Sequence, residues 1–165
     1  MNAQALARDY LRKGKARRRA LQVLFEEGSY DDVVREAQAI VELILKGTLR
    51  FIGVDPPKRH DVGDTVKEFG DRLPESWRMR LDEIETISRT LFEERGHAFY
   101  GDEASLTPAS ALFGEEDAQR AIGWVDELLG LFEALLQDEQ GDMPKGDDQR
   151  GLDHGVGHPS SRCPR

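Results

Sequence analysis

The chain has 165 residues, enough to bury one hydrophobic core and too few for two full-sized domains. Its net charge of −9 argues against wrapping of nucleic acid by the whole surface, although it leaves room for a local basic patch. The one cysteine, Cys163, excludes a disulfide framework, and because no apolar run approaches the roughly 18 residues of a membrane span, we expect a cytoplasmic protein without membrane contact.

Two long helices are predicted for the first 52 residues. Residues 3–27 place their apolar side chains at helical spacing, and Gly28 then ends the first helix. Ser29 is a favourable N-cap for a second helix that reaches residue 52. Because so short a turn joins them, the two helices are expected to run antiparallel as a hairpin.

The second helix is the most apolar long segment in the chain. Apolar residues cover well over half of its circumference when it is wrapped at about 100° per residue. A helix of this kind is normally buried by several neighbours, so we predict that it is the central helix of the fold. The residues concerned are Val33, Val34, Ala37, Ile40, Val41, Leu43, Ile44, Leu45, Thr48, Leu49, Phe51 and Ile52.

A rigid turn and a short helix follow. Pro56 and Pro57 cannot continue a helix, so residues 53–59 are predicted to turn, and His60 is interpreted as part of that turn. Asp61 is the expected N-cap of a short helix that stops before Pro74.

The remaining elements complete an all-α prediction. A third long helix is expected over residues 75–99, an irregular segment over 100–114 and a last helix over 115–137. Residues 138–165 are polar and rich in Gly, Pro and Asp, and we expect them to be disordered. The predicted architecture is an up-and-down bundle of four long helices plus one short helix, with a helical domain at 1–137 and a polar tail at 138–165.

Basic residues gather in the middle of the first helix. Arg12, Lys15, Arg18 and Arg19 belong to this group, together with Lys13 and Arg17. The pattern fits a solvated helix face, and it also fits a patch that contacts phosphates. No aromatic residues interleave with these charges, so the segment offers no support for base stacking.

Three stretches in this order resemble the HEPN family (higher eukaryotes and prokaryotes nucleotide-binding). In the second helix and its turn, Glu42 and Lys46 lie one turn apart ahead of a Pro-Pro-x-x-His-Asp sequence. The stretch ERGHAFYGDE is similar to the end of the third long helix of the family, and FGEEDAQRAI to the start of the fourth. The resemblance covers about residues 5–137 and implies a helical bundle that is commonly a dimer.

The resemblance also implies two classes of function. Many HEPN proteins are metal-independent RNA endonucleases, often toxins paired with a small nucleotidyltransferase, and others serve as binding or partner domains. The nucleases carry an Arg, four to six intervening residues and then a His near the end of the third long helix. Here no arginine stands at that spacing before His60, His97, His154 or His158.

Arg95 and His97 are nevertheless the candidates for catalysis if the protein is a nuclease. They lie roughly 200° apart on a regular helix, so they could grip one phosphate only across a dimer or if the helix unwound at Gly96. In metal-free RNA cleavage the histidine would act as acid or base, and the cation would stabilise the phosphorane.

Arg95 also falls within the predicted inner stripe of the 75–99 helix. A buried guanidinium without a partner is costly, so Arg95 either reaches a carboxylate or water, or faces a subunit-interface cleft that receives an anion. Tyr100 is interpreted as a plug for the bundle end, and in some nuclease-type members of the family a tyrosine close behind the His is nucleotidylated. The stripe is Trp77, Leu81, Ile84, Ser88, Leu91, Phe92, Ala98 and Phe99.

Other chemistries have little support in the sequence. There is no glycine-rich phosphate loop and no Cys or His cluster at zinc spacing, and His154 and His158 lie in the predicted tail. We expect neither a metal site nor a cofactor.

The favoured function is a homodimeric nucleotide- or RNA-binding partner module that works with a nucleotidyltransferase, through Arg95, Tyr100 and the basic residues Arg12, Lys15, Arg18 and Arg19. The alternatives are an RNA endonuclease toxin and a purely structural oligomerising bundle.

Overall fold

The computed structural model describes residues 2–141, with side chains as far as Asp138. Over this range the chain forms helices and no strand, and Asp102 and Thr107 make an isolated bridge. The all-α prediction is therefore confirmed. The elements are α1 (Ala3–Glu26), α2 (Tyr30–Phe51), α3 (Gly63–Glu68), the 3-10 helix η1 (Gly70–Arg72), α4 (Glu75–Arg78), α5 (Leu81–Tyr100), α6 (Ala109–Leu112) and α7 (Glu115–Gly141).

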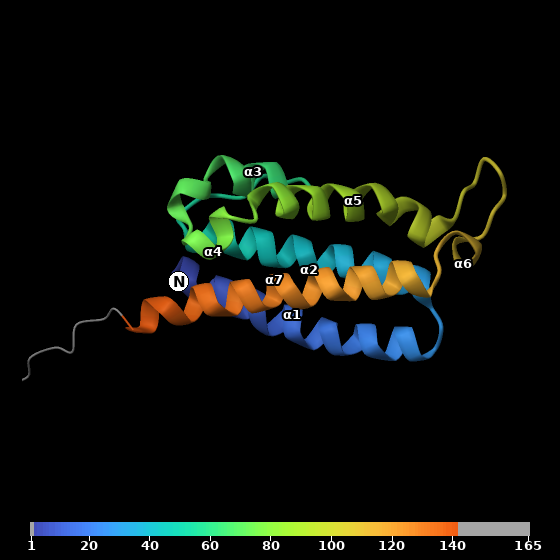
Figure 1. The fold of residues 1–165 in the computed structure, drawn as a ribbon, viewed down its shortest axis with the longest axis horizontal. Coiled ribbons are helices and arrows are strands. Elements are labelled where there is room, and N and C mark those ends of the chain that lie inside the picture. Colours follow the sequence, from blue (N-terminus) through green and yellow to red (C-terminus); the bar gives the residue numbers. More distant parts are fainter. Residues whose placement is uncertain (1, 142–165) are drawn as a thin grey trace, which may run out of the picture.

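The four long helices α1, α2, α5 and α7 run along the long axis of the molecule (Figure 1). The short helices α3 and α4 lie at the end where the chain begins, and α6 lies at the opposite end. The loop between α5 and α6 projects beyond the bundle at that second end. This is the predicted bundle of four long helices, with more short elements than the one that the sequence indicated.

Helix α2 is the central helix, as its apolar circumference predicted. Eleven of its 22 residues are buried, and it contacts α1, α5 and α7. Its fully buried side chains, such as Ile40, Ile44 and Leu45, each stabilise the fold by about 1.5–3 kcal/mol through removal of apolar surface from water. Ser29 does occupy the N-cap position, but its hydroxyl donates to Asp32 Oδ2 at 2.7 Å and makes no bond to the helix backbone.

The prediction of one continuous helix over 75–99 was wrong. Helix α4 ends at Arg78, and α5 begins at Leu81 after a non-helical Arg80. Tertiary contacts explain the break, because Trp77 is fully buried and its Nε1 donates to the Leu131 carbonyl at 3.3 Å. Arg80 pairs with Glu83 and with Glu127 of α7.

Three other predicted boundaries change. Helix α3 begins at Gly63 with Val62 as its N-cap, because the Asp61 carboxylate accepts the Ser88 hydroxyl at 2.6 Å as well as the more distant Gly63 N–H. Helix α6 lies within the segment predicted to be irregular. Helix α7 continues to Gly141, past the predicted end at 137, and the remainder of the predicted disordered tail, including His154 and His158, lies outside the described residues.

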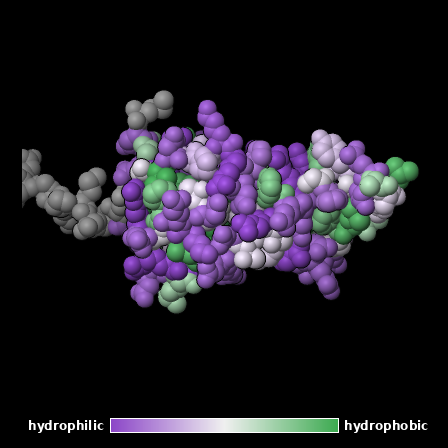
Figure 2. Space-filling view, turned by 90° about the horizontal axis from the view of Figure 1, so that it is seen from above, coloured by the Kyte–Doolittle hydropathy of each residue, from purple (hydrophilic) through white to green (hydrophobic). Residues whose placement is uncertain are grey.

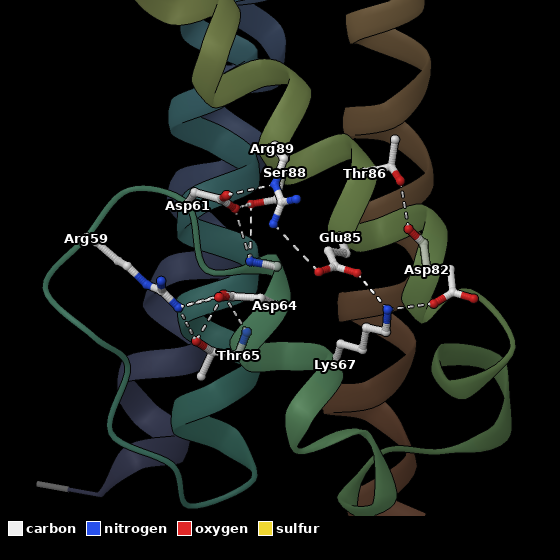
Figure 3. A network of polar contacts seen from close by, with 11 residues as sticks. Arg59, Asp61, Asp64, Thr65, Lys67, Asp82, Glu85, Thr86, Ser88 and Arg89 are labelled. Atoms are coloured by element: carbon white, nitrogen blue, oxygen red, sulfur yellow. Dashed lines mark hydrogen bonds and ion pairs between the residues drawn. The ribbon is translucent and has the colours of Figure 1, made fainter.

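The first half of α5 is held against α3 by a polar network (Figure 3). Lys67 reaches both Asp82 and Glu85, at 2.9 and 2.7 Å. Arg89 lies 3.7 Å from Glu85 and 3.8 Å from Asp61. This network fixes the position of α5 and therefore of the side chains in its second half.

On the described chain, none of the helices combines the length and apolar character that a membrane crossing requires.

Candidate functional site

A concave surface with a volume of about 960 Å³ lies at the end of α5. We call it the α5 hollow. Helix α5 contributes Phe92, Arg95, His97, Phe99 and Tyr100 to its wall, α2 contributes Arg35, and the segment Gly101–Ala104 closes one side. The hollow is open to solvent and of the size that a small-molecule ligand or a short peptide segment occupies.

Arg95 is partly buried in this wall, and it makes no hydrogen bond or ion pair to any described residue. The sequence placed it on the inner stripe of the helix, with a carboxylate on a neighbouring helix as one explanation. The adjacent carboxylate, Glu94, pairs with a different arginine, because Glu94 Oε1 accepts a hydrogen bond from Arg120 of α7 at 2.7 Å. The guanidinium of Arg95 is therefore available to an anion that enters the hollow.

Two aromatic residues of the predicted inner stripe face solvent instead. Phe92 is 42% exposed and Phe99 is 50% exposed, because the elements that pack most closely on α5, which are α2, α3 and α6, leave much of these rings uncovered. Arg35 lies over the Phe99 ring at 4.2 Å, and Tyr100 meets the same ring edge-on at 4.6 Å. The stripe prediction holds for the buried residues Ile84, Ser88, Leu91 and Ala98.

His97 is exposed and lines the same hollow as Arg95. Helix α5 stays regular through Gly96, so the two side chains leave it in different directions and reach different parts of the wall. Asp102 lies near His97, and hydrogen bonds from the Ser105 side chain and backbone hold the pKa of its carboxyl below the ordinary value. The charge of His97 lowers the Asp102 pKa further.

Tyr100, a predicted binding residue, is 68% exposed at the end of α5. It therefore does not plug the bundle as the sequence suggested. Gly101 ends the helix with φ +76°, and its N–H donates to the His97 carbonyl at 2.9 Å. The glycine lets the chain turn sharply here, so Tyr100 stays at the rim of the hollow.

The basic residues of α1 are largely paired within the chain. Lys15 pairs with Glu133 and Arg18 with Asp126, both on α7, and Arg12 pairs with Asp9 at 2.8 Å. Arg19 is exposed and has no ion pair with the described residues. These contacts fit the solvated-face interpretation better than the phosphate patch, because most of the cations already have carboxylate partners.

A contact that sequence reasoning missed joins His60 to α2. His60 Nδ1 lies 3.0 Å from Glu42 Oε2, and Lys46 Nζ lies 2.8 Å from Glu42 Oε1. Burial alone would raise the pKa of the Glu42 carboxyl, but the hydrogen bonds from Lys46 and His60 outweigh it and hold that pKa below its ordinary value. His60 remains a turn residue, and its ring ties the turn to the central helix.

Among the described residues, no group of three or more His, Cys, Asp or Glu side chains is arranged to hold a metal ion.

The chain was compared with known protein families, curated proteins and solved structures. The HEPN domain family model matches residues 7–140, which include all or nearly all of each long helix and every residue that lines the α5 hollow. The chain belongs to the HEPN domain family. No curated protein and no solved structure gives a significant match to this HEPN domain.

Proposed function

We propose that this HEPN domain is a nucleotide- or RNA-binding partner module. It would act in the cytoplasm as a homodimer and work with a nucleotidyltransferase-type protein, in a setting like that of toxin–antitoxin pairs. The chain lacks the Arg–His spacing of the nuclease members, so we propose binding without self-sufficient RNA cleavage.

The observation that carries this proposal is Arg95 in the α5 hollow. Its guanidinium has no partner among the described residues and lines an open hollow, so its hydrogen-bond donors are available to an entering anion. A guanidinium fork matches a phosphate group by two parallel hydrogen bonds. Arg95 is therefore suited to receive a phosphate from a nucleotide or from an RNA backbone.

The aromatic residues of the hollow fit the remainder of such a ligand. Phe92 and Tyr100 expose ring surface at the wall that also holds Arg95, and Arg35 covers Phe99 with a second positive charge. Bases stack on aromatic rings with little regard to sequence, at about 1–3 kcal/mol per base. This combination supports binding of an unpaired nucleotide segment in preference to a regular duplex.

Arg95→Ala tests the proposal by fluorescence anisotropy with a labelled single-stranded RNA. We expect a loss of affinity on the order of tenfold, as for removal of a charge-assisted hydrogen bond. Arg78→Ala is the matched control, because Arg78 is an exposed arginine on α4 without an ion pair to the described residues. Equal affinity of the Arg95→Ala variant and the wild type would reject Arg95 as the phosphate contact.

The second candidate function is a metal-independent RNA endonuclease, and it is favoured by the presence of Arg95 and His97 in one hollow. Incubation of the protein with structured RNA and EDTA separates it from the first. We expect the RNA to remain intact. Cleavage that is lost in His97→Ala and retained in His60→Ala would establish the endonuclease instead.

The remaining alternative is a structural bundle that only oligomerises. Co-expression with a nucleotidyltransferase encoded beside this chain tests the partner role against it. A stable complex that survives size-exclusion chromatography supports the partner module. Failure of every adjacent nucleotidyltransferase to bind, together with absence of RNA binding, would leave the structural role.

A further inference from the structure

Gly96 leaves a bare patch of helix backbone in the α5 hollow, which we call the Gly96 patch. The residue is exposed, and a Cβ built there would meet no atom within 4 Å. On a helix surface the nearest neighbours of a residue lie three and four positions away on either side. For Gly96 these neighbours are three aromatic residues and one carboxylate, which are all exposed and all line the hollow: Phe92, Glu93, Phe99 and Tyr100.

A second exposed glycine, Gly123 on α7, shows what sets the Gly96 patch apart. A Cβ at Gly123 would also meet no atom within 4 Å. Its neighbours at the same spacing are all polar, namely Gln119, Arg120, Asp126 and Glu127. An open glycine is therefore not enough to indicate a ligand site, and the aromatic border is what distinguishes the Gly96 patch.

The Gly96 patch has the features of a stacking site for a flat ring. Figure 2 shows apolar side chains gathered at the end of the molecule that carries the α5–α6 loop, on an otherwise largely hydrophilic surface. Arg35 already covers the Phe99 ring at 4.2 Å, whereas the Phe92 ring has no aromatic or cationic neighbour among the described residues. Because position 96 has no Cβ, an unpaired base can lie close to the helix backbone and stack on Phe92.

The carboxylates of the hollow call for a ligand group other than phosphate, which they would repel. Asp102 is engaged within its own loop, since it accepts hydrogen bonds from Ser105 Oγ at 2.7 Å and from the Ala104 N–H at 3.0 Å. Glu93 and Glu103 make no hydrogen bond or ion pair with the described residues. Of these two, Glu93 borders the Gly96 patch from the helix itself, whereas Glu103 lies on the loop wall.

An ionised carboxylate only accepts hydrogen bonds, so it selects base edges that donate them. Guanine presents two adjacent donors on its Watson–Crick edge, N1–H and the N2 amino group, which match the two oxygens of one carboxylate. Adenine and cytosine place an acceptor nitrogen beside their amino group, and uracil places a carbonyl oxygen on each side of its N–H. Each of these three bases would therefore set a lone pair against the carboxylate.

We propose that the Gly96 patch is a guanine-selective base site. Phe92 stacks on the base, and Glu93 accepts hydrogen bonds from N1–H and from the N2 amino group. This inference rests on the proposed function, because Arg95 lines the same hollow and would hold the phosphate of the bound nucleotide. It narrows the ligand from any unpaired nucleotide to one that contains guanine.

Fluorescence anisotropy with a labelled oligouridine, and with the same strand carrying one central guanosine, tests the base preference. The wild type is expected to bind the guanosine strand on the order of tenfold more tightly, as for other bidentate contacts to a base. A strand with inosine, which keeps N1–H and lacks the N2 amino group, should fall between the two. Equal affinity for the guanosine and inosine strands would remove the N2 contact from the site.

Glutamine variants test which carboxylate reads the base. Glu93→Gln should bring the ratio of the two affinities close to one, because glutamine offers one acceptor in place of two charged oxygens. Glu103→Gln is the matched control and should keep the ratio of the wild type. The ratio is compared within each variant, so that the general gain in RNA affinity on removal of a negative charge does not enter the result.

Leucine variants test the Gly96 patch itself. Gly96→Leu should abolish the guanosine preference, because the new side chain occupies the place of the base. Gly123→Leu is the matched control and should leave the preference unchanged, since a Cβ there also has open space. Thermal unfolding of both variants verifies that the bundle is intact, and leucine is a good helix former at both positions.

Competition by unlabelled mononucleotides distinguishes the two sources of guanine. Displacement of the guanosine strand by GMP at lower concentration than by AMP would show that the site accepts a free guanine nucleotide. A guanosine preference that neither mononucleotide reverses would show that the site requires RNA.

The outcomes separate this site from the proposed function on which it rests. Equal wild-type affinity for the oligouridine and guanosine strands, with both weakened in Arg95→Ala, overturns the guanine site and leaves the phosphate contact in place. A preference that survives Glu93→Gln and disappears in Glu103→Gln overturns the role of Glu93. Absence of binding to every strand overturns both proposals.

Discussion

The two halves of α5 differ in how their polar and apolar groups are satisfied. In the first half, polar side chains have partners in or beside the α3 network (Figure 3), namely Asp82, Glu85, Ser88 and Arg89. Ile84, in the same half, is fully buried. In the second half, arginine and histidine side chains line an open hollow and aromatic rings face solvent. One helix therefore serves as an anchor at one end and presents a binding surface at the other.

The contrast predicts that truncation of a core residue in the anchored half costs more stability than truncation of an aromatic residue that lines the hollow. Ile84→Ala should lower the free energy of unfolding by about 2–5 kcal/mol, since it removes a fully buried side chain from the core. Phe92→Ala, in the hollow, should lower it by less than about 1 kcal/mol. Urea denaturation measures both, and equal losses in the two variants would remove the distinction between the halves.

Glycine substitutions should change stability in opposite directions. A Cβ at Gly63 would lie 2.8 Å from Ser88 Cβ and 2.9 Å from Glu85 Cα, so Gly63→Ala should cost about 1–3 kcal/mol by forcing α3 away from α5. A Cβ at Gly96 would meet no atom within 4 Å, so Gly96→Ala should gain about 0.5–1 kcal/mol from the lower entropy of the unfolded chain. Thermal unfolding of the pair checks both signs.

Glu42 and Glu94 should contribute in opposite directions to the pH dependence of folding stability. The folded pKa of Glu42 lies below its ordinary value of 4.5, so its stabilising contribution is present above pH 4.5 and is lost as pH falls through the folded pKa. Burial raises the pKa of Glu94, whose Oε2 has no hydrogen-bond partner among the described residues, so its ionised form is destabilising and that cost disappears on acidification.

Two variants, each with glutamine in place of one of these glutamates, test both predictions when the free energy of unfolding is measured from neutral pH to below pH 4. Glu42→Gln should reduce the loss of stability on acidification, and Glu94→Gln should increase it. If the free energy of unfolding changed with pH to the same extent in both variants, the environments assigned to Glu42 and Glu94 would be contradicted.

The smallest expected effect concerns the basic face of α1. Arg18→Ala removes a partly exposed ion pair to Asp126 and should lower the free energy of unfolding by about 0.2–1 kcal/mol. RNA affinity should stay close to wild type, because this arginine already has a partner within the chain. A large loss of RNA affinity in this variant would shift the binding surface from α5 to α1.

The sequence predicted the long helices well because the spacing of their apolar residues and the residues that begin and end them are local properties. The central position of α2 followed from its wide apolar circumference, and the turn before His60 followed from two prolines. The break after Arg78 could not be predicted from the sequence, because it depends on the contact of Trp77 with α7.

The site was only partly predictable for the same reason. Arg95 and Tyr100 were identified from their positions at the end of the predicted helix and from the family resemblance, but periodicity placed Phe92 and Phe99 inside the core. Whether an apolar stripe is buried depends on the neighbours that cover it, and the neighbours of the second half of α5 leave these two rings 42% and 50% exposed. The partners of Lys15 and Arg18 lie more than 100 residues away in the sequence, so local patterns could not reveal them.

The salt dependence of RNA binding tests most directly whether Arg95 contacts a phosphate. Each phosphate contact to a single strand contributes about −0.7 to the slope of log affinity against log salt concentration. Removal of Arg95 should therefore make the slope shallower by about that amount, whereas Arg78→Ala should leave it unchanged. Parallel slopes for the wild type and Arg95→Ala would contradict the central claim that the far end of α5 binds phosphate.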